Sequence, residues 1–195
     1  QTAFLTINYA LTVATSGDTV QVLPGTYYEH VQFNHVGVSL IGSPNDPSLT
    51  VIDGQQTGRV ITIVDPYSYS NPLSYLIKGF TIQNGKAYNS DINSEDNLGG
   101  ALFGTYSSMQ LKNMIIQNNA AASSGGGIYY TGSNSDSSIS LSNVILANNY
   151  SGQLGGGIVV SGANNVLIDH SKIVLNKNMT GYDHGGGGAF LNSIN

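Results

Sequence analysis

A short pattern recurs at nearly even intervals in the second half of the chain, and it limits the possible folds more than any other feature. A glycine pair followed by an apolar run occurs four times, with the last glycine of each pair at positions 100, 127, 157 and 188. These positions are separated by 27, 30 and 31 residues. Self-similarity with a period of about 20 to 50 residues is typical of solenoids, in which each repeat packs only against its neighbours. We therefore expect a stack of repeats around one continuous core.

The segments between the glycine pairs have the pattern of β-strands. Apolar residues alternate along them, as in Phe80 and Ile82 or Met114 and Ile116, and helical periodicity is missing. Coils of about 30 residues with strands and turns but no helix indicate an all-β fold, a right-handed parallel β-helix. The last segment is one residue longer than the others, which predicts a bulge there. The four segments are residues 77–84, 111–118, 141–148 and 168–176.

An asparagine ends each of these segments. Asn84, Asn118, Asn148 and Asn176 stand where the strand ends and the chain must turn. Asparagine tolerates the left-handed backbone conformation, and its side chain hydrogen-bonds within turns. When coils stack, the side-chain amides at equivalent positions can also hydrogen-bond to one another. We therefore expect these four asparagines to form a structural ladder.

The first residues follow a different pattern, which predicts a cap. Ile7, Ala10, Leu11 and Ala14 have the spacing of a short amphipathic helix. Such a helix would cover the apolar end and the unpaired strand edges of the first coil, as solenoids require. We predict one domain over residues 1–195, with the cap in residues 1–18 and the coils in residues 19–195. Since the C-terminal end shows no comparable cap, we expect a fragment of a longer chain, or else end-to-end self-association.

Residues 10–29 closely resemble the N-terminal coil of the pectin-lyase-like β-helix superfamily. The resemblance is carried by Ala10-Leu11 and by the run Ser16-Gly17-Asp18-Thr19-Val20-Gln21-Val22-Leu23-Pro24-Gly25-Thr26-Tyr27-Tyr28-Glu29. The glycine-rich, Asn-ended repeats are similar to those of bacterial surface β-helix proteins, including the chlamydial polymorphic outer-membrane proteins and related adhesins. The resemblance implies the fold over nearly the whole chain. It leaves function open, because this scaffold hosts lyases, hydrolases, esterases and non-catalytic adhesins.

The marks of the superfamily's enzymes are missing from the chain. The resemblance implies that a pectate lyase would have a calcium site of several acidic groups beside a catalytic arginine or lysine. The chain has one arginine, Arg59, and five lysines, with no acidic cluster evident beside any of them. Inverting hydrolysis needs paired carboxylates, and the only adjacent acidic pair is Glu95-Asp96. We also find no equivalent of the Asp/Asp/Arg/Gln site that the family implies for pectin methylesterases.

One acidic loop is a candidate for binding calcium. It carries oxygen-bearing side chains at nearly alternate positions, an arrangement that suits a hard cation. A solvated loop without a metal is the interpretation that we favour, so no cofactor is required. The candidate ligands are Asp91, Asn93, Glu95 and Asp96.

Two histidines lie next to aspartates. His170 follows Asp169, and His184 follows Asp183, so each could form an acid–base pair. Neighbours on an extended strand point to opposite faces, however. We therefore expect ordinary surface or turn residues rather than facing pairs.

Exposed tyrosines are candidates for stacking on sugars. Tyr67 and Tyr69 lie in the Pro/Ser/Asn-rich insertion 65–75, which has the composition of a loop. We assign to them a candidate glycan contact, and expect most of the twelve tyrosines to pack structurally.

The charge and the apolar content of the chain limit the kinds of partner that we expect. Charged residues make up 9% of the chain and its net charge is −5, so a nucleic acid is not expected to bind. No stretch approaches the roughly 18 apolar residues of a membrane span. We expect a non-catalytic extracellular or cell-surface protein that acts as an adhesin, stalk or assembly unit and contacts glycans. The alternative is a fragment of a polysaccharide lyase or glycosidase acting on acidic polysaccharides.

Overall fold

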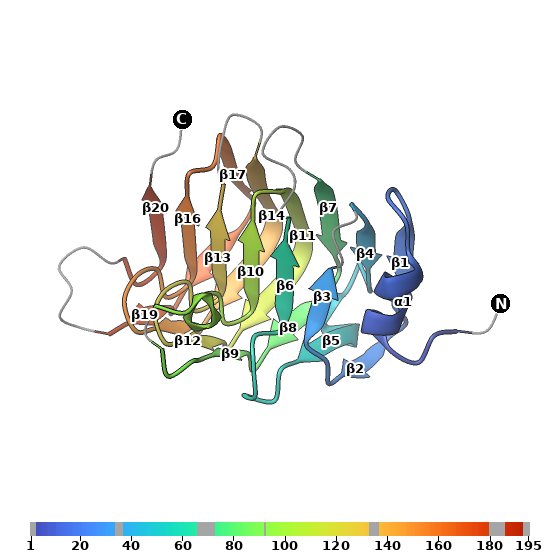
Figure 1. Ribbon diagram of the computed structural model, residues 1–195, viewed down its shortest axis with the longest axis horizontal. Coiled ribbons are helices and arrows are strands. Elements are labelled where there is room, and N and C mark those ends of the chain that lie inside the picture. The colour runs from blue at the N-terminus through green and yellow to red at the C-terminus, as the bar shows by residue number, and fades with distance from the viewer. Residues whose placement is uncertain are drawn as a thin grey trace.

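The computed structural model describes residues 3–33, 37–65, 73–91, 93–132, 137–179 and 186–192. The chain is mostly β-structure and forms a parallel β-solenoid of about five turns with one short N-terminal helix, as predicted. Figure 1 shows the strands stacked side by side from β1 near the N-terminus to β20 near the C-terminus. Among the described residues, no helix is both long enough and apolar enough to cross a membrane.

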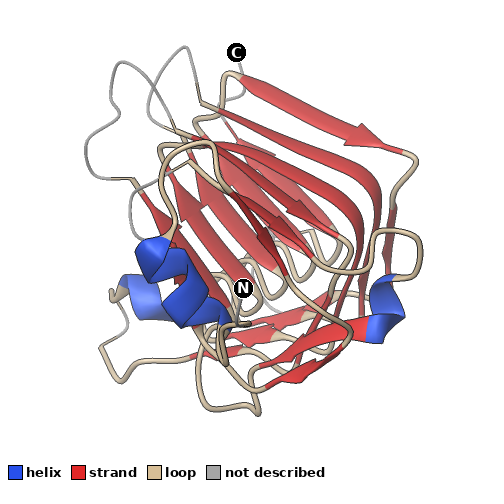
Figure 2. Ribbon diagram, turned by 90° about the vertical axis from the view of Figure 1, so that its right-hand side faces the viewer, coloured by secondary structure: helices blue, strands red, loops and turns tan. Residues whose placement is uncertain are grey.

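The strands belong to three parallel sheets that run along the solenoid (Figure 2). The ten-stranded sheet, sheet A, has two arms that meet in the long strands β11 and β14. Its strands are β1 (Thr19–Gln21), β2 (Gly25–Tyr27), β4 (Ser39–Ile41), β5 (Thr50–Asp53), β7 (Ser74–Lys78), β8 (Thr81–Gln83), β11 (Ser108–Gln117), β14 (Ser138–Ala147), β17 (Asn165–Asp169) and β18 (Lys172–Val174). The six-stranded sheet, sheet B, contains β3 (Val31–Phe33), β6 (Ile61–Val64), β10 (Leu102–Thr105), β13 (Ile128–Thr131), β16 (Ile158–Ser161) and β20 (Ala189–Asn192). The four-stranded sheet, sheet C, contains β9 (Lys86–Ala87), β12 (Ala120–Ala121), β15 (Tyr150–Ser151) and β19 (Lys177–Asn178).

The core is a set of columns in which one inward residue from each coil stacks on the next. Leu111 lies in register with Ile77 on one side and with Leu141 on the other. All three side chains have 0% exposure. Since strand side chains alternate between faces, a regular repeat places every inward residue in such a column. A second column, built from Ile82, Ile116 and Leu146, follows the same rule.

In four successive coils, sheet A bends between its arms at one residue that adopts a left-handed conformation. Asn113 of β11 and Asn143 of β14 have φ values of 51° and 55°. Gly79 and His170 hold the corresponding positions in the neighbouring coils and also have positive φ. Asn143 Nδ2 donates to Asn113 Oδ1 at 3.1 Å, so the bend carries a short amide ladder of its own.

The predicted asparagine ladder divides into two adjacent columns. Asn84, Asn118 and Asn148 have φ values of 55–57° and form the turn, and Leu175 takes that place in the last described coil. Asn176 belongs to the next column. There Asn119 Nδ2 donates to Asn149 Oδ1 at 3.0 Å, and Asn149 Nδ2 donates to Asn176 Oδ1 at 2.9 Å.

The longer last repeat contains no bulge at the predicted place. Leu141 pairs with Ile168 and Leu146 pairs with Ile173, so the offset is 27 residues at both ends of the segment. Asn176 therefore aligns with Asn149 rather than with Asn148. The last segment ends one residue later because Leu175 stands in the place of Asn148, and the next asparagine, Asn176, stands in the place of Asn149. The predicted bulge was wrong.

The N-terminal helix α1 (Ile7–Val13) covers the first coil. Ile7, Ala10 and Leu11 are buried, with Ile7 and Leu11 in the main core. Thr6 caps the helix by accepting from the Tyr9 N–H at 3.1 Å. The Glu29 carboxylate, from the motif that resembles pectin-lyase-like proteins, accepts from the N–H groups of Ile7 and Asn8 at 2.9 and 3.0 Å. Glu29 thus ties the cap to the coil.

Candidate functional site

The acidic loop between β9 and β10 uses its side chains for its own turns. Asp91 Oδ1 accepts from the Asn93 N–H at 3.0 Å, and Asp96 Oδ2 accepts from Asn89 Nδ2 at 3.1 Å. Glu95 begins the 3-10 helix η2 (Glu95–Asn97). Within the described part of the chain, no three side chains of His, Cys, Asp or Glu gather closely enough to hold a metal ion. The structure therefore does not bring Asp91, Glu95 and Asp96 together as a calcium site.

Arg59 fastens this loop to sheet B. Its Nε donates to the carbonyl oxygens of Leu98 and Gly99 at 2.9 and 3.2 Å, and its Nη2 donates to the carbonyl of Glu95 at 2.5 Å. The guanidinium also lies 4.5 Å from the ring centroid of Phe103, a cation–π contact. Burial lowers the pKa of Arg59 to about 10, against the opposing effect of the charges on Asp96 and Glu95. Arg59 therefore stays charged at neutral pH and acts as a strap.

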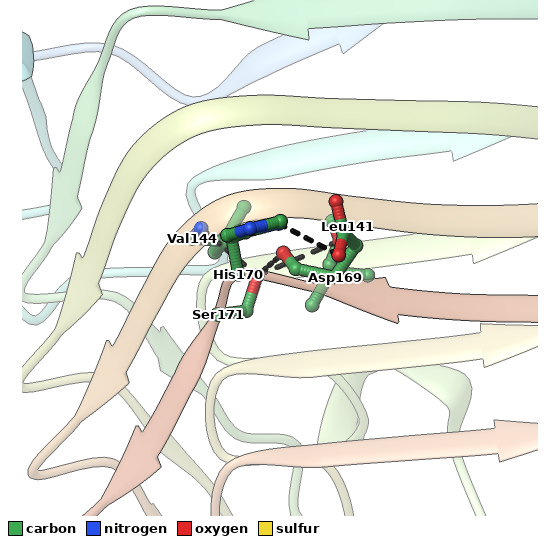
Figure 3. Close-up of polar contacts among 5 residues, drawn as sticks. All are labelled: Leu141, Val144, Asp169, His170 and Ser171. Atoms are coloured by element: carbon green, nitrogen blue, oxygen red, sulfur yellow. Dashed lines mark hydrogen bonds and ion pairs between the residues drawn. The ribbon is translucent and has the colours of Figure 1, made fainter.

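Asp169 and His170 form an exposed ion pair at the bend between β17 and β18 (Figure 3). His170 Nδ1 lies 2.7 Å from Asp169 Oδ1, and their side chains are 82% and 50% exposed. The expectation that the two would not face each other was wrong, because His170 has a φ of 47° and is not in an extended strand. The hydrogen bond with Asp169, and then the charge of its carboxylate, raise the pKa of His170.

Ser171 does not complete a catalytic triad with this pair. Its Oγ donates to the Asp169 carbonyl at 2.8 Å and accepts from the Val144 N–H at 3.0 Å. Figure 3 shows the hydroxyl engaged with backbone groups while the imidazole lies beside Asp169. The second predicted pair, Asp183 and His184, lies outside the described residues.

The tyrosines divide between core and surface. Tyr67 and Tyr69, the predicted glycan contacts, lie outside the described residues. Tyr75 and Tyr130 are buried in the core. Tyr88 and Tyr150 are 67% and 42% exposed, and so offer rings to solvent on the side of sheet C.

The outer surface of the first arm of sheet A carries columns of short polar side chains, which we call the serine face. Ser138, Ser140 and Ser142 of β14 alternate with buried residues and are each half-buried. Ser138 Oγ donates to Ser108 Oγ of the preceding coil at 3.2 Å. The alternation of serine with Ile139 and Leu141 is the sequence signal from which this face could have been found. The serine face consists of Ser74, Leu76, Lys78, Ser108, Gln110, Lys112, Ser138, Ser140, Ser142, Asn165, Leu167 and Asp169.

An apolar cavity of about 520 Å³ lies between α1 and the first coil. Ala10, Val20, Val22 and Tyr27 are among the residues that line it. Its one acidic residue, Asp18, accepts from the N–H and the hydroxyl of Thr15 at 2.7 and 2.8 Å. These hydrogen bonds lower the pKa of Asp18. The carboxylate thus closes the turn that follows α1.

Comparisons with protein-family models, with curated proteins and with solved structures found no match to this chain. The parallel β-solenoid is established by the structure, whereas no family match supports the pectin-lyase-like superfamily in particular. What the chain does must therefore be argued from its own surface.

Proposed function

We propose that this chain is a non-catalytic extracellular or cell-surface β-solenoid that acts as an adhesin, stalk or assembly unit and contacts glycans through the serine face. The observation that carries this proposal is that several of its few charged side chains are engaged in contacts that hold the scaffold together. Glu29 holds the helical cap, Asp53 closes a turn and Arg59 fastens a loop. Groups committed to such contacts stabilise the scaffold and are not poised for proton transfer.

Asp53 illustrates this use. Burial raises its pKa, but hydrogen bonds from the Gln55 N–H and from the amides of Gln83 and Asn84 outweigh burial and leave the pKa lowered. The distances are 2.8, 2.9 and 2.8 Å. A carboxylate held in its charged form by three donors is a poor general acid at neutral pH.

The serine face supports the glycan contact. One of its columns, formed by Ser74, Ser108, Ser138 and Asn165, presents a hydroxyl or amide group in four successive coils, at a spacing of about 4.8 Å, the distance between neighbouring strands. A sugar chain lying along the solenoid axis would therefore meet similar donors and acceptors in successive coils. Because this column is uncharged, we expect binding through it to depend little on salt, whereas a contact with Lys78 or Lys112 on the same face would weaken as salt is added.

A test is to measure binding of the chain to a panel of neutral and acidic polysaccharides. Ser140→Arg, in the middle of the serine face, should weaken binding about tenfold, equivalent to about 1.4 kcal/mol. Gln32→Arg adds the same charge to an exposed outward position of β3 on sheet B and serves as the control. Equal binding by the two variants would remove the serine face as the contact surface.

The alternative is a polysaccharide lyase or glycosidase, and the observation in its favour is the Asp169–His170 pair. An exposed imidazole 2.7 Å from a carboxylate could transfer a proton to a bound sugar. The assay is incubation with acidic polysaccharides, with and without calcium, followed by detection of unsaturated or reducing-end products. Product that disappears in His170→Gln would replace the proposed function with this one.

A further inference from the structure

The last described coil exposes apolar residues whose counterparts in the preceding coil are completely buried. Ile168 is 37% exposed, whereas Leu141, its partner in register, is 0% exposed. Leu191 is 46% exposed, whereas its partner Val160 is 0% exposed. Strands β17 and β18 pair with β14 on one side, and no described strand pairs with their other edge. This edge therefore combines free backbone groups with apolar side chains, a template for strand pairing.

The side chains of β17 match those of β18 in polarity and charge when the two strands are aligned antiparallel. If the same edge of a second copy lies antiparallel to it, centred on the bend, Ile168 of β17 in one copy faces Ile173 of β18 in the other. Both residues continue inward columns, those of Leu141 and Leu146. The same register sets Asp169 opposite Lys172, two outward and exposed residues of opposite charge.

The next pair in this register is apolar as well. Leu167 and Val174 are 56% and 43% exposed, and both point outward. Antiparallel partners directly opposite each other share a face of the sheet, so the register joins inward with inward and outward with outward. A slip by one residue would set apolar residues against charged ones and exchange the faces.

We propose that a second copy of this chain pairs with the β17–β18 edge, through a two-fold axis that passes between His170 and Ser171. The left-handed conformation of His170 divides the edge into two arms, and the axis exchanges them, so that β17 of each copy lies antiparallel to β18 of the other. In such an isologous contact every pair occurs twice. Asp169 engages His170 through Oδ1, and a carboxylate has a second oxygen that can accept from Lys172 of the other copy.

The opposite end of the solenoid favours this arrangement over head-to-tail stacking. Helix α1 packs against β1 and β3 of the first coil, and Leu11 is 1% exposed in the core there. Figure 1 shows α1 at the end of the molecule far from β20. Helix α1 thus covers part of that end of the solenoid, whereas the β17–β18 edge carries no such cover among the described residues.

This inference deepens the proposed role as an assembly unit and rests on it; two of the residues that it pairs, Leu167 and Asp169, also belong to the serine face. The experiment is sedimentation equilibrium of the 195-residue chain over a wide concentration range. We expect a reversible dimer. Lys172→Asp should raise its dissociation constant at least tenfold, because the Asp169 carboxylate of each copy then faces a second carboxylate in place of an ammonium group. Lys177→Asp, on β19 of the same coil, makes the same change in charge away from the paired edge and should leave the dimer intact.

A mixing experiment tests the register. Asp169→Lys chains and Lys172→Asp chains should each dissociate alone but form a mixed dimer when combined, because both facing pairs then have opposite charges. Circular dichroism of each variant checks that it is folded. A wild-type chain that stays monomeric, or variants that behave like Lys177→Asp, would overturn the inference. Polysaccharide binding measured on Lys172→Asp, a residue outside the serine face, reports separately on the proposed function.

Discussion

At the scale of single residues, the two asparagines of each turn have different tasks. Asn148 supplies a left-handed backbone with a φ of 55°, whereas Asn149 is 1% exposed and serves as a rung of the internal ladder. Asn149 accepts from Asn119 and donates to Asn176 and to the carbonyl of Ile116. The first asparagine thus shapes the turn, and the second satisfies polar groups inside the solenoid.

Replacing the second asparagine should therefore be far more costly than replacing the first. Asn149→Ala removes the acceptor of the buried backbone N–H of Asn119 and the side-chain donor to the carbonyl of Ile116, and we expect a loss of at least about 2 kcal/mol. Asn148→Gly should change the free energy of unfolding by only roughly a few tenths of a kcal/mol, because glycine adopts positive φ freely. Urea unfolding measures both, and similar losses would contradict the division of tasks.

The Asp169–His170 pair gives a prediction for pH. Because the pKa of His170 is raised in the folded chain, the pair stabilises the fold fully below the unfolded value of about 6.5. That contribution disappears as the pH rises through the folded pKa. NMR titration should show His170 titrating above the ordinary range, and Asp169→Asn should return it toward that range. Coincident titration curves for the two proteins would show that the pair does not form in solution.

At the scale of elements, the cap and the first coil depend on one carboxylate. Glu29 lies in the segment after β2 and binds two N–H groups at the start of α1. These groups have no partner within the helix, and a negative charge near a helix N-terminus is favourable. Glu29 therefore joins the helix to the first coil.

Glu29→Gln should loosen the cap without unfolding the solenoid. The amide has one acceptor oxygen and no charge, so we expect a loss of about 1 kcal/mol. Hydrogen exchange should accelerate at Ile7 and Asn8 while amides of β11 and β14 stay protected. Gln32→Glu changes charge on a neighbouring exposed side chain of β3 and is the control. Uniform acceleration in all strands would mean that the cap and the coils unfold as one unit.

The predictable elements were those that depend on the repeat alone. The alternation in residues 111–118 predicted the strands and the stacking of Leu111 on Ile77 and Leu141, because equivalent positions must align when coils stack. The bend at Asn113 was not predicted, although the sequence carries a signal for it: the inward residues Leu111 and Met114 are three positions apart instead of two, which interrupts the alternation. The same omission led to the wrong expectation for Asp169 and His170, whose contact depends on that bend.

At the scale of the whole molecule, each coil is stabilised by its neighbours. An inner coil packs against a coil on either side, whereas the last described coil packs against one, and the exposures of Leu141 and Ile168 show this difference. The repeat could predict the columns but not the serine face or the β17–β18 edge as functional surfaces. Those depend on which columns remain uncovered once the chain is folded.

Shortening one side chain of the same inward column in an inner coil and one in the last described coil tests whether neighbouring coils stabilise each other. Leu141→Ala should cost about 2 to 5 kcal/mol, as expected for a fully buried aliphatic side chain. Ile168→Ala should cost less than half as much, because its side chain is partly exposed and contacts a coil on one side only. Both are measured by urea unfolding in a Lys172→Asp background, in which the proposed dimer is dissociated. Equal losses would mean that Ile168 is covered in the monomer in solution, and would leave the edge no apolar surface to offer a second copy.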